Sequence, residues 1–152
     1  MKVFNSINDI LDFAIKEEIK AANLYADLSK KSKSKEMQKV FSQFSKEELG
    51  HKKKLESIKG GGEISVQETP VQDMQIADYL IDVDKSRDDL SYQEALIIAM
   101  KEEKAAFKLY HNLALRINHP ETKKVFLMLA QEEAKHKLRF EIEYDDYVLK
   151  EN

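Results

Sequence analysis

The sequence predicts an all-α fold, a four-helix bundle in which a long crossover joins two duplicated helical hairpins. Three observations predict it. Apolar residues recur at steps of three and four along four long segments, as on the buried side of a helix. Gly (4) and Pro (2) are scarce among the 152 residues, so long helices can form without interruption. The third observation is an internal repeat.

The repeat relates the two halves of the chain at a constant offset. Residues 6–58 align without a gap on residues 91–143. Unrelated helices would share apolar spacing, but they would not be expected to share each Glu, His and Tyr. The chemically distinctive identical pairs are Glu18/Glu103, Tyr25/Tyr110, Glu48/Glu133 and His51/His136. We therefore predict that a helical hairpin has been duplicated.

Each predicted hairpin has recognisable ends and a turn. The first hairpin, 6–58, begins at Ser6, whose hydroxyl can accept from an unpaired helical N–H, and turns in a Lys/Ser segment near 31–35. The second, 91–149, begins at Ser91, which forms the better capping box because Glu94 follows three residues later. It turns at 118–120, where proline suits the first position of a helix.

The connecting segment, 59–90, breaks the helical pattern. Glycines at 60–62 end the second helix, Pro70 keeps the next stretch non-helical, and residues 73–81 are expected to form a short helix. A helix of about 25 residues is roughly 37 Å long, and a crossover of this length can span it. The second hairpin can therefore start at the opposite end of the bundle, and residues 1–152 are expected to form one domain.

Composition excludes several function classes. The chain has no cysteine, which excludes disulfides, thiolate metal sites and iron–sulfur clusters. The net charge is −3 with both signs interspersed, so nothing points to nucleic acid. The Lys-rich stretches at 30–35 and 51–54 are read as a turn and a solvated helix face. No apolar run reaches the length of a signal peptide or a membrane span, so we expect a cytoplasmic protein without a membrane partner.

Six polar residues interrupt the apolar stripes. Two Glu-x-x-His motifs place a carboxylate and an imidazole on one face, about one turn apart. The first helix of each hairpin adds one further carboxylate at mid-height. The six residues are Glu18, Glu48, His51, Glu103, Glu133 and His136.

A metal pair explains these residues better than a structural role. A single inward His is usually an ordinary core residue, but four carboxylates in one apolar interior are very costly unless they are compensated. No Lys or Arg lies beside them on the stripe, and shared protons or inward water are the weaker alternatives. Two divalent cations offset the four charges. Carboxylate and imidazole ligands without thiolate suit Fe, Mn or Zn.

The spacing also suggests how two metals are shared. Four Glu and two His form the di-iron or di-manganese pattern of helical bundles. We expect Glu48 and Glu133 to bridge the metals. Glu18 with His51 would complete one metal site, and Glu103 with His136 the other, each with an open position for an oxygen ligand.

At these residues the chain resembles the rubrerythrin family of ferritin-like proteins, over nearly its whole length. The matching pieces are Glu18-x-x-Ala21-x-x-x-Tyr25, Glu48-x-x-His51, Glu103-x-x-Ala106-x-x-x-Tyr110 and Glu133-x-x-His136. The resemblance implies a ferritin-like bundle, at least dimeric, that holds two iron ions per chain. It also implies reaction with hydrogen peroxide or dioxygen, as in the peroxide reductases of oxidative stress defence.

Four departures from related patterns bear on the function that the resemblance implies. Without cysteine there is no rubredoxin iron site, so a separate protein would have to donate electrons. Ala106 stands where rubrerythrins carry an additional carboxylate, and the remaining six ligands equally resemble the ferroxidase centre of bacterioferritins. Leu49 replaces the haem-binding Met of bacterioferritins, so no haem is expected. We also expect no fifth helix of the kind that a ferritin cage needs.

The remaining polar residues are assigned more simply. Tyr25 and Tyr110 are read both as core aromatics and as donors that orient ligand carboxylates. His119 is read as a loop or cap residue, and His111 has no role. Four functions stay open: a peroxide- or dioxygen-dependent redox enzyme, a ferroxidase, a metal-stabilised bundle without turnover, and a hydroxylase, since demethoxyubiquinone hydroxylases resemble this ligand set.

Overall fold

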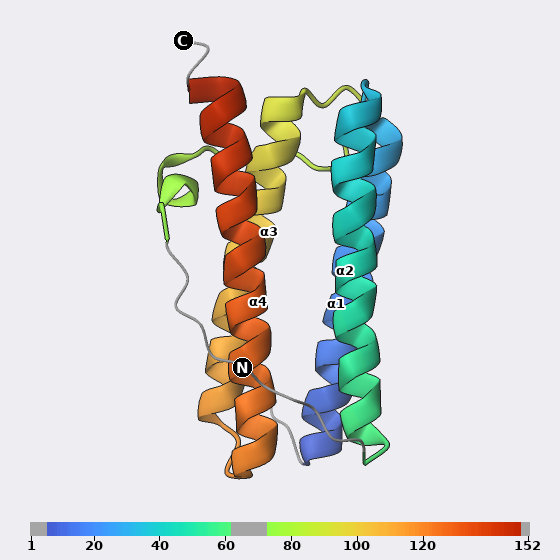
Figure 1. Ribbon diagram of the computed structural model, residues 1–152, viewed down its shortest axis with the longest axis vertical. Helices are drawn as coiled ribbons and strands as arrows, with labels where there is room; N and C mark the ends of the chain where they lie inside the picture. The colour runs from blue at the N-terminus through green and yellow to red at the C-terminus, as the bar shows by residue number, and fades with distance from the viewer. Residues whose placement is uncertain (1–5, 62–72, 150–152) are drawn as a thin grey trace.

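The structure is a computed structural model that describes residues 6–61 and 73–149. Its main elements are four long helices, as the sequence predicts (Figure 1): α1 (Ile7–Lys31), α2 (Lys35–Lys59), α3 (Tyr92–Leu115) and α4 (Pro120–Tyr144). Two short elements accompany them, the 3₁₀ turn η1 (Ile76–Tyr79) and the π-helical turn η2 (Asp145–Leu149). Helix α1 packs along α2, and α3 packs along α4.

The helices begin at side chains that cap them. The Ser6 hydroxyl accepts a hydrogen bond from the Asp9 N–H at 3.1 Å. Ser91 and Glu94 form the expected capping box at the start of α3. His119 caps α4 through Nδ1, which accepts from the N–H of the residue three positions on, and Pro120 occupies the first turn. Each cap satisfies an N–H that a helix leaves unpaired.

The two hairpins run in opposite directions along the bundle. Helix α2 ends at the glycine pair Gly60–Gly61, and Gly61 has φ +86°, a conformation that side chains disfavour. Figure 1 shows α2 ending at the bottom of the bundle and α3 starting at the top, so the crossover spans its length. Equivalent positions near the middles of α1 and α3, such as Glu18 and Glu103, are therefore brought to the same height. The expected helix at 73–81 is only the turn η1, and Pro70 lies outside the described residues.

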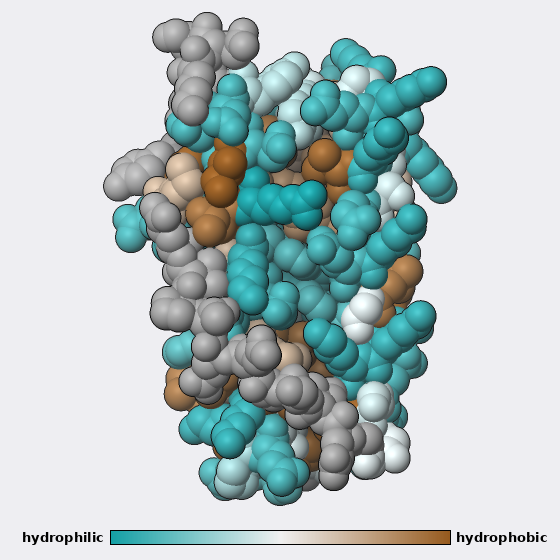
Figure 2. Space-filling model, in the orientation of Figure 1, coloured by the Kyte–Doolittle hydropathy of each residue, from teal (hydrophilic) through white to brown (hydrophobic). Residues whose placement is uncertain are grey.

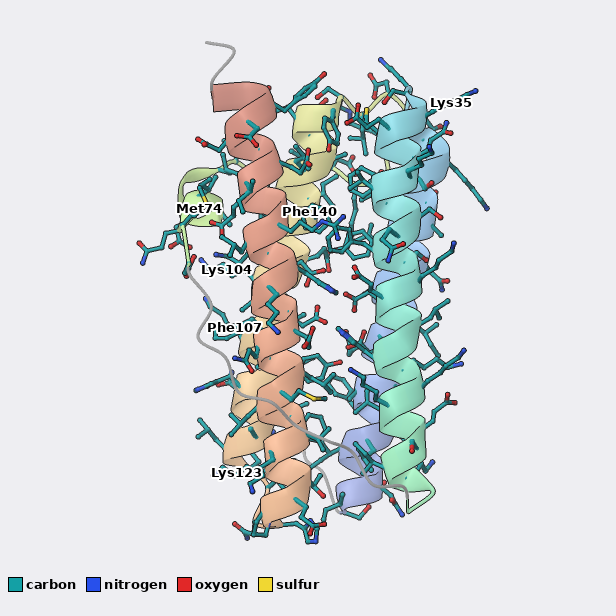
Figure 3. All side chains as sticks on the ribbon, in the orientation of Figure 1. Lys35, Met74, Lys104, Phe107, Lys123 and Phe140 are labelled. Atoms are coloured by element: carbon teal, nitrogen blue, oxygen red, sulfur yellow. The ribbon has the colours of Figure 1, made fainter. Side chains whose placement is uncertain are left out.

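Buried polar residues fasten the second part of the crossover to α4. The Glu141 carboxylate is fully buried and accepts hydrogen bonds from the N–H groups of Ile76 (2.9 Å) and Met74 (3.4 Å). Lys137, also buried, donates to Glu141 at 3.3 Å and pairs with Asp73. Figure 3 shows Met74 beside α4, level with Phe140. Sequence reasoning did not find this cluster, because Glu141 meets N–H groups from a distant segment of the chain. Its repeat mate, Glu56, is exposed on α2.

The apolar core consists of two clusters, one above and one below the middle of the bundle. The first is rich in aromatic rings, with Tyr25, Phe41 and Phe140 stacked on one another. The second is mainly aliphatic and includes Leu11 and Leu55. Hydrophilic side chains dominate the face of α2 and α4 shown in Figure 2. Within the described part of the chain, no helix has both the length and the apolar character needed to cross a membrane.

Candidate metal centre

All six predicted ligands lie between the two apolar clusters, and each is at most 7% exposed. The apolar stripe of each helix explains this burial, because each of these side chains takes a stripe position that faces the other helices. The structure therefore brings together the whole set that the sequence singled out: Glu18 from α1, Glu48 and His51 from α2, Glu103 from α3, and Glu133 and His136 from α4.

The six residues form two overlapping groups. Glu18, Glu48, His51 and Glu133 make one group, in which one ligand atom from each residue lies within 4.8 Å of the others. The second group contains Glu48, Glu103, Glu133 and His136 with the same spacing. Both groups share the two carboxylates of the Glu-x-x-His motifs. This is the arrangement that a pair of metals with two bridging carboxylates requires.

Each imidazole faces the carboxylate of the opposite hairpin. The Nδ1 atom of His51 lies 2.8 Å from Glu133 Oε1 and 3.5 Å from Glu18 Oε1. The Nδ1 atom of His136 lies 2.9 Å from Glu48 Oε1 and 3.5 Å from Glu103 Oε1. The two rings stack at 5.4 Å with an angle of 10° between their planes. Both histidines thus present Nδ1 to the middle of the cluster.

Several of the converging atoms lack hydrogen-bond partners. Buried polar atoms without a partner are costly, and the usual remedies are a hydrogen bond or a coordinated cation. The atoms concerned within the two groups are Glu18 Oε2, His51 Nδ1, Glu103 Oε2 and Glu133 Oε1. His51 Nδ1 and Glu133 Oε1 approach closely, yet neither is hydrogen-bonded. Oxygen and nitrogen donors that point at a common centre fit divalent iron, manganese or zinc.

Without a cation, protons must offset the carboxylate charge. Burial disfavours the charged imidazoles, but the adjacent carboxylates outweigh it and raise the pKa of His51 to about 10 and of His136 to about 11. Burial, together with Glu48, raises the pKa of Glu18 to about 8. Burial and the charges of neighbouring glutamates also raise the pKa of Glu133 well above 4.5. Metal ions and protons therefore compete for the same atoms.

The Glu48 carboxylate is the exception. Burial works against its charge, but its interactions with Glu18, His136 and His51 outweigh burial and lower its pKa below the ordinary 4.5. Glu48 therefore keeps its negative charge at the centre of the cluster.

Two tyrosines hold carboxylates of the cluster across the bundle. The Tyr25 hydroxyl donates to Glu103 Oε1 at 2.6 Å, and the Tyr110 hydroxyl donates to Glu18 Oε1. Burial and the nearby glutamate charges raise the pKa of both phenols well above 10, so they keep their protons and remain donors. The sequence indicated this role. It did not show that each tyrosine binds the glutamate of the other hairpin, because that pairing depends on how α1 and α3 face each other.

A cavity of about 370 Å³ connects the cluster with the surface between α1 and α3. Its walls include Ala21 and Ala106, and its inner end exposes the carboxylates of the cluster. Two ion pairs lie at its outer edge, Glu17 with Lys20 (3.3 Å) and Glu102 with Lys85 (3.0 Å). The alanines matter here because a longer side chain at either position would fill the path to the carboxylates of the cluster.

One acidic residue beside the cluster escaped the sequence analysis. Glu47 precedes Glu48, and its Oε2 atom lies 3.5 Å from His136 Nε2. Nothing in the sequence distinguished it, because the equivalent residue in the second hairpin, Glu132, is also acidic.

Comparison with known proteins agrees with this geometry. A model of the family described as Rubrerythrin matches residues 9–144. A solved structure of a hypothetical protein from Pyrococcus furiosus is similar, with a TM-score of 0.63 and 25% identity, covering 93% of this chain and 89% of that one. No curated protein matches the chain.

Proposed function

The chain belongs to the rubrerythrin family, and from this membership and the buried cluster we propose that it is a di-iron protein that reduces hydrogen peroxide with electrons from a separate donor protein. The observation that carries the proposal is the pair of four-residue groups that share Glu48 and Glu133. A single ion would leave part of this donor set uncompensated, whereas two ions would use all six side chains.

The proposed ligand assignment follows the two groups. Glu48 and Glu133 would be shared by the two ions, Glu18 and His51 would complete one site, and Glu103 and His136 would complete the other. Reduction of one hydrogen peroxide to two waters takes two electrons and two protons. When bound, two adjacent iron ions supply both electrons by passing from the ferrous to the ferric state.

The protein's own residues have three tasks in this proposal. Tyr25 and Tyr110 fix the orientation of Glu103 and Glu18 by hydrogen bonding, which limits their freedom to rotate. The two apolar clusters exclude bulk water on either side of the site. The cavity between α1 and α3 gives a small oxidant a path to the carboxylate end of the cluster.

The choice of oxidant is the first test. We expect anaerobically reduced, iron-loaded protein to be oxidised faster by hydrogen peroxide than by dioxygen in separate stopped-flow experiments. Glu103→Gln, loaded under the same conditions, serves as the control, because it should lose one metal and with it the two-electron reaction.

A second candidate function has its own support. Ala106 stands where rubrerythrins carry an additional carboxylate, and the six remaining ligands also suit a ferroxidase that oxidises and handles iron. Faster oxidation by dioxygen would contradict the peroxidase proposal. So would oxidation of excess Fe(II) over many turnovers into a retained mineral, and either result would favour the iron-handling function.

The cavity gives a further prediction. Ala106→Leu should leave metal content unchanged but slow oxidation by peroxide by roughly tenfold, equivalent to about 1.4 kcal/mol, because the added carbons narrow the path to the cluster. Ala134→Leu is the matched control, since it is a partly buried helical alanine outside the cavity whose repeat mate is already Leu49. Equal rates in the two variants would show that the oxidant enters elsewhere.

A further inference from the structure

The two halves of the cluster are not equivalent, although the repeat makes their ligands identical. The difference lies on the far side of the two imidazoles, away from the ligand carboxylates. On one side, Glu47 Oε2 lies 3.5 Å from His136 Nε2. On the other, Glu132, the repeat mate of Glu47, pairs with Lys135 at 3.5 Å, and within the described residues it forms no ion pair with His51.

The environment of the Glu47 carboxylate points to a role. Its side chain is 34% exposed, but the Oε2 atom is buried and has no hydrogen-bond partner. A buried carboxylate oxygen without a donor is costly, and the imidazole N–H of His136 is the donor within reach. The contact with His136 therefore gives the buried Glu47 oxygen a donor and gives the imidazole N–H an acceptor.

The chemistry of a metal-binding histidine explains what a carboxylate beside its second nitrogen does. A neutral imidazole that binds a metal through Nδ1 carries its proton on Nε2, and that N–H then needs an acceptor. A carboxylate acceptor holds the ring in this tautomer, fixes its orientation and makes Nδ1 a stronger donor to the metal. His136 presents Nδ1 to the cluster and Nε2 to Glu47, which is the arrangement this effect requires.

We propose that Glu47 is a positioning residue for His136 and that it makes the metal site containing His136 the tighter of the two. This inference rests on the proposed function, because it needs metal at the cluster. It adds an order of filling: the site of Glu103 and His136 fills first, and the site of Glu18 and His51 fills second.

Titration of the apoprotein with Co(II) under argon at fixed pH tests the proposal. Calorimetry and Co(II) absorption should resolve two binding steps in the unaltered protein. Glu47→Gln should weaken the tighter step by roughly 10- to 100-fold, as loss of such a carboxylate does at other metal sites, and leave the weaker step unchanged. Glu47→Asp should recover part of the loss, and Glu132→Gln, the matched control, should titrate like the unaltered protein.

A second readout separates positioning from a general structural effect. In the Co(II)-loaded protein, the N–H protons of both ligand imidazoles give paramagnetically shifted NMR signals. The His136 signal should exchange with D₂O more slowly than the His51 signal, and Glu47→Gln should remove this difference. Circular dichroism confirms that each variant is folded.

The outcomes separate the two proposals. Two bound metals whose affinities do not respond to Glu47→Gln would overturn the inference and leave the metal centre standing. An equal weakening of both steps would also overturn it, because Glu47 would then lack preference for one site. Absence of metal binding in the unaltered protein would instead refute the proposed function.

Discussion

Replacing Glu133 with Gln is expected to abolish tight binding of both metals, whereas replacing Glu18 with Gln is expected to cost only one. Glu133 belongs to both ligand groups, and Glu18 belongs to one. Mutation of groups that only hydrogen-bond to ligands lowers metal affinity by roughly 10- to 100-fold. Loss of a shared ligand should therefore lower the affinity for both ions by at least roughly 100-fold. Metal analysis after anaerobic Fe(II) loading measures the result.

The design compares variants that differ in position but not in chemistry. Glu48→Gln should behave like Glu133→Gln, and Glu103→Gln like Glu18→Gln. Glu132→Gln, next to a bridging residue but outside the cluster, should retain two metals. Loss of a single metal in Glu133→Gln would refute the bridging assignment. A stoichiometry of one or zero in the unaltered protein would refute the two-metal centre.

The buried cluster of six Glu and His residues could be predicted from sequence because two independent signals coincide at the same residues. The apolar stripes determine which side of each helix is buried, so a Glu or His on a stripe must point inward. The repeat then shows that the inward Glu and His residues occur twice at one offset. Both signals are local or periodic, and neither depends on how the helices are placed. The inward direction of all six residues could therefore be predicted, and the structure places them together in the interior.

The features that the sequence did not reveal depend on contacts between distant segments. Tyr25 lies on the same helix as Glu18, yet it donates to Glu103 on α3. Glu141 looks like an ordinary charged residue of α4 until the crossover places two N–H groups against it. Glu47 and Glu132 are the same amino acid at equivalent positions, but Glu47 lies beside the His136 imidazole whereas Glu132 pairs with Lys135. In all three cases the amino-acid type was visible, but its partner was determined by packing.

Removing metal is expected to destabilise the protein strongly at pH 8 and only slightly at pH 5. The unfolded chain titrates its carboxyl groups near pH 4.5 and its imidazoles near pH 6.5. In the fold without a cation, Glu18 holds its proton up to about pH 8, and His51 and His136 hold theirs up to about pH 10 and about pH 11. The folded state therefore binds more protons than the unfolded state from mildly acidic to alkaline pH.

This proton difference determines the direction of the pH dependence. Stability falls with rising pH wherever the folded state binds more protons. The contribution of Glu18 is complete below about pH 4.5 and is lost as pH rises through about 8. The contribution of His51 is complete below about pH 6.5 and is lost as pH rises through about 10. The pKa of Glu48 is lowered, so its contribution to stability is instead lost as pH falls, and only below about pH 4.5.

Bound metal should remove this dependence, because it replaces the protons at the same atoms. Metal at 1,000 times its dissociation constant stabilises a fold by about 4 kcal/mol, which corresponds to roughly 8–16 °C for a chain of this size. We expect an increase in melting temperature of that order with Zn(II) at pH 8 and a much smaller one at pH 5, where protons compete. Thermal unfolding followed by circular dichroism, with and without a chelator, measures both.

A double variant supplies the control for this prediction. Glu18→Gln combined with Glu103→Gln removes two of the four carboxylate charges, so its apoprotein should lose less stability between pH 5 and pH 8 than the unaltered apoprotein. Surface ion pairs are the same in both proteins and cannot produce the difference. An unaltered apoprotein that melts at the same temperature as the metal-bound form at pH 8 would contradict the prediction. The four converging carboxylates would then not destabilise the fold in the absence of metal.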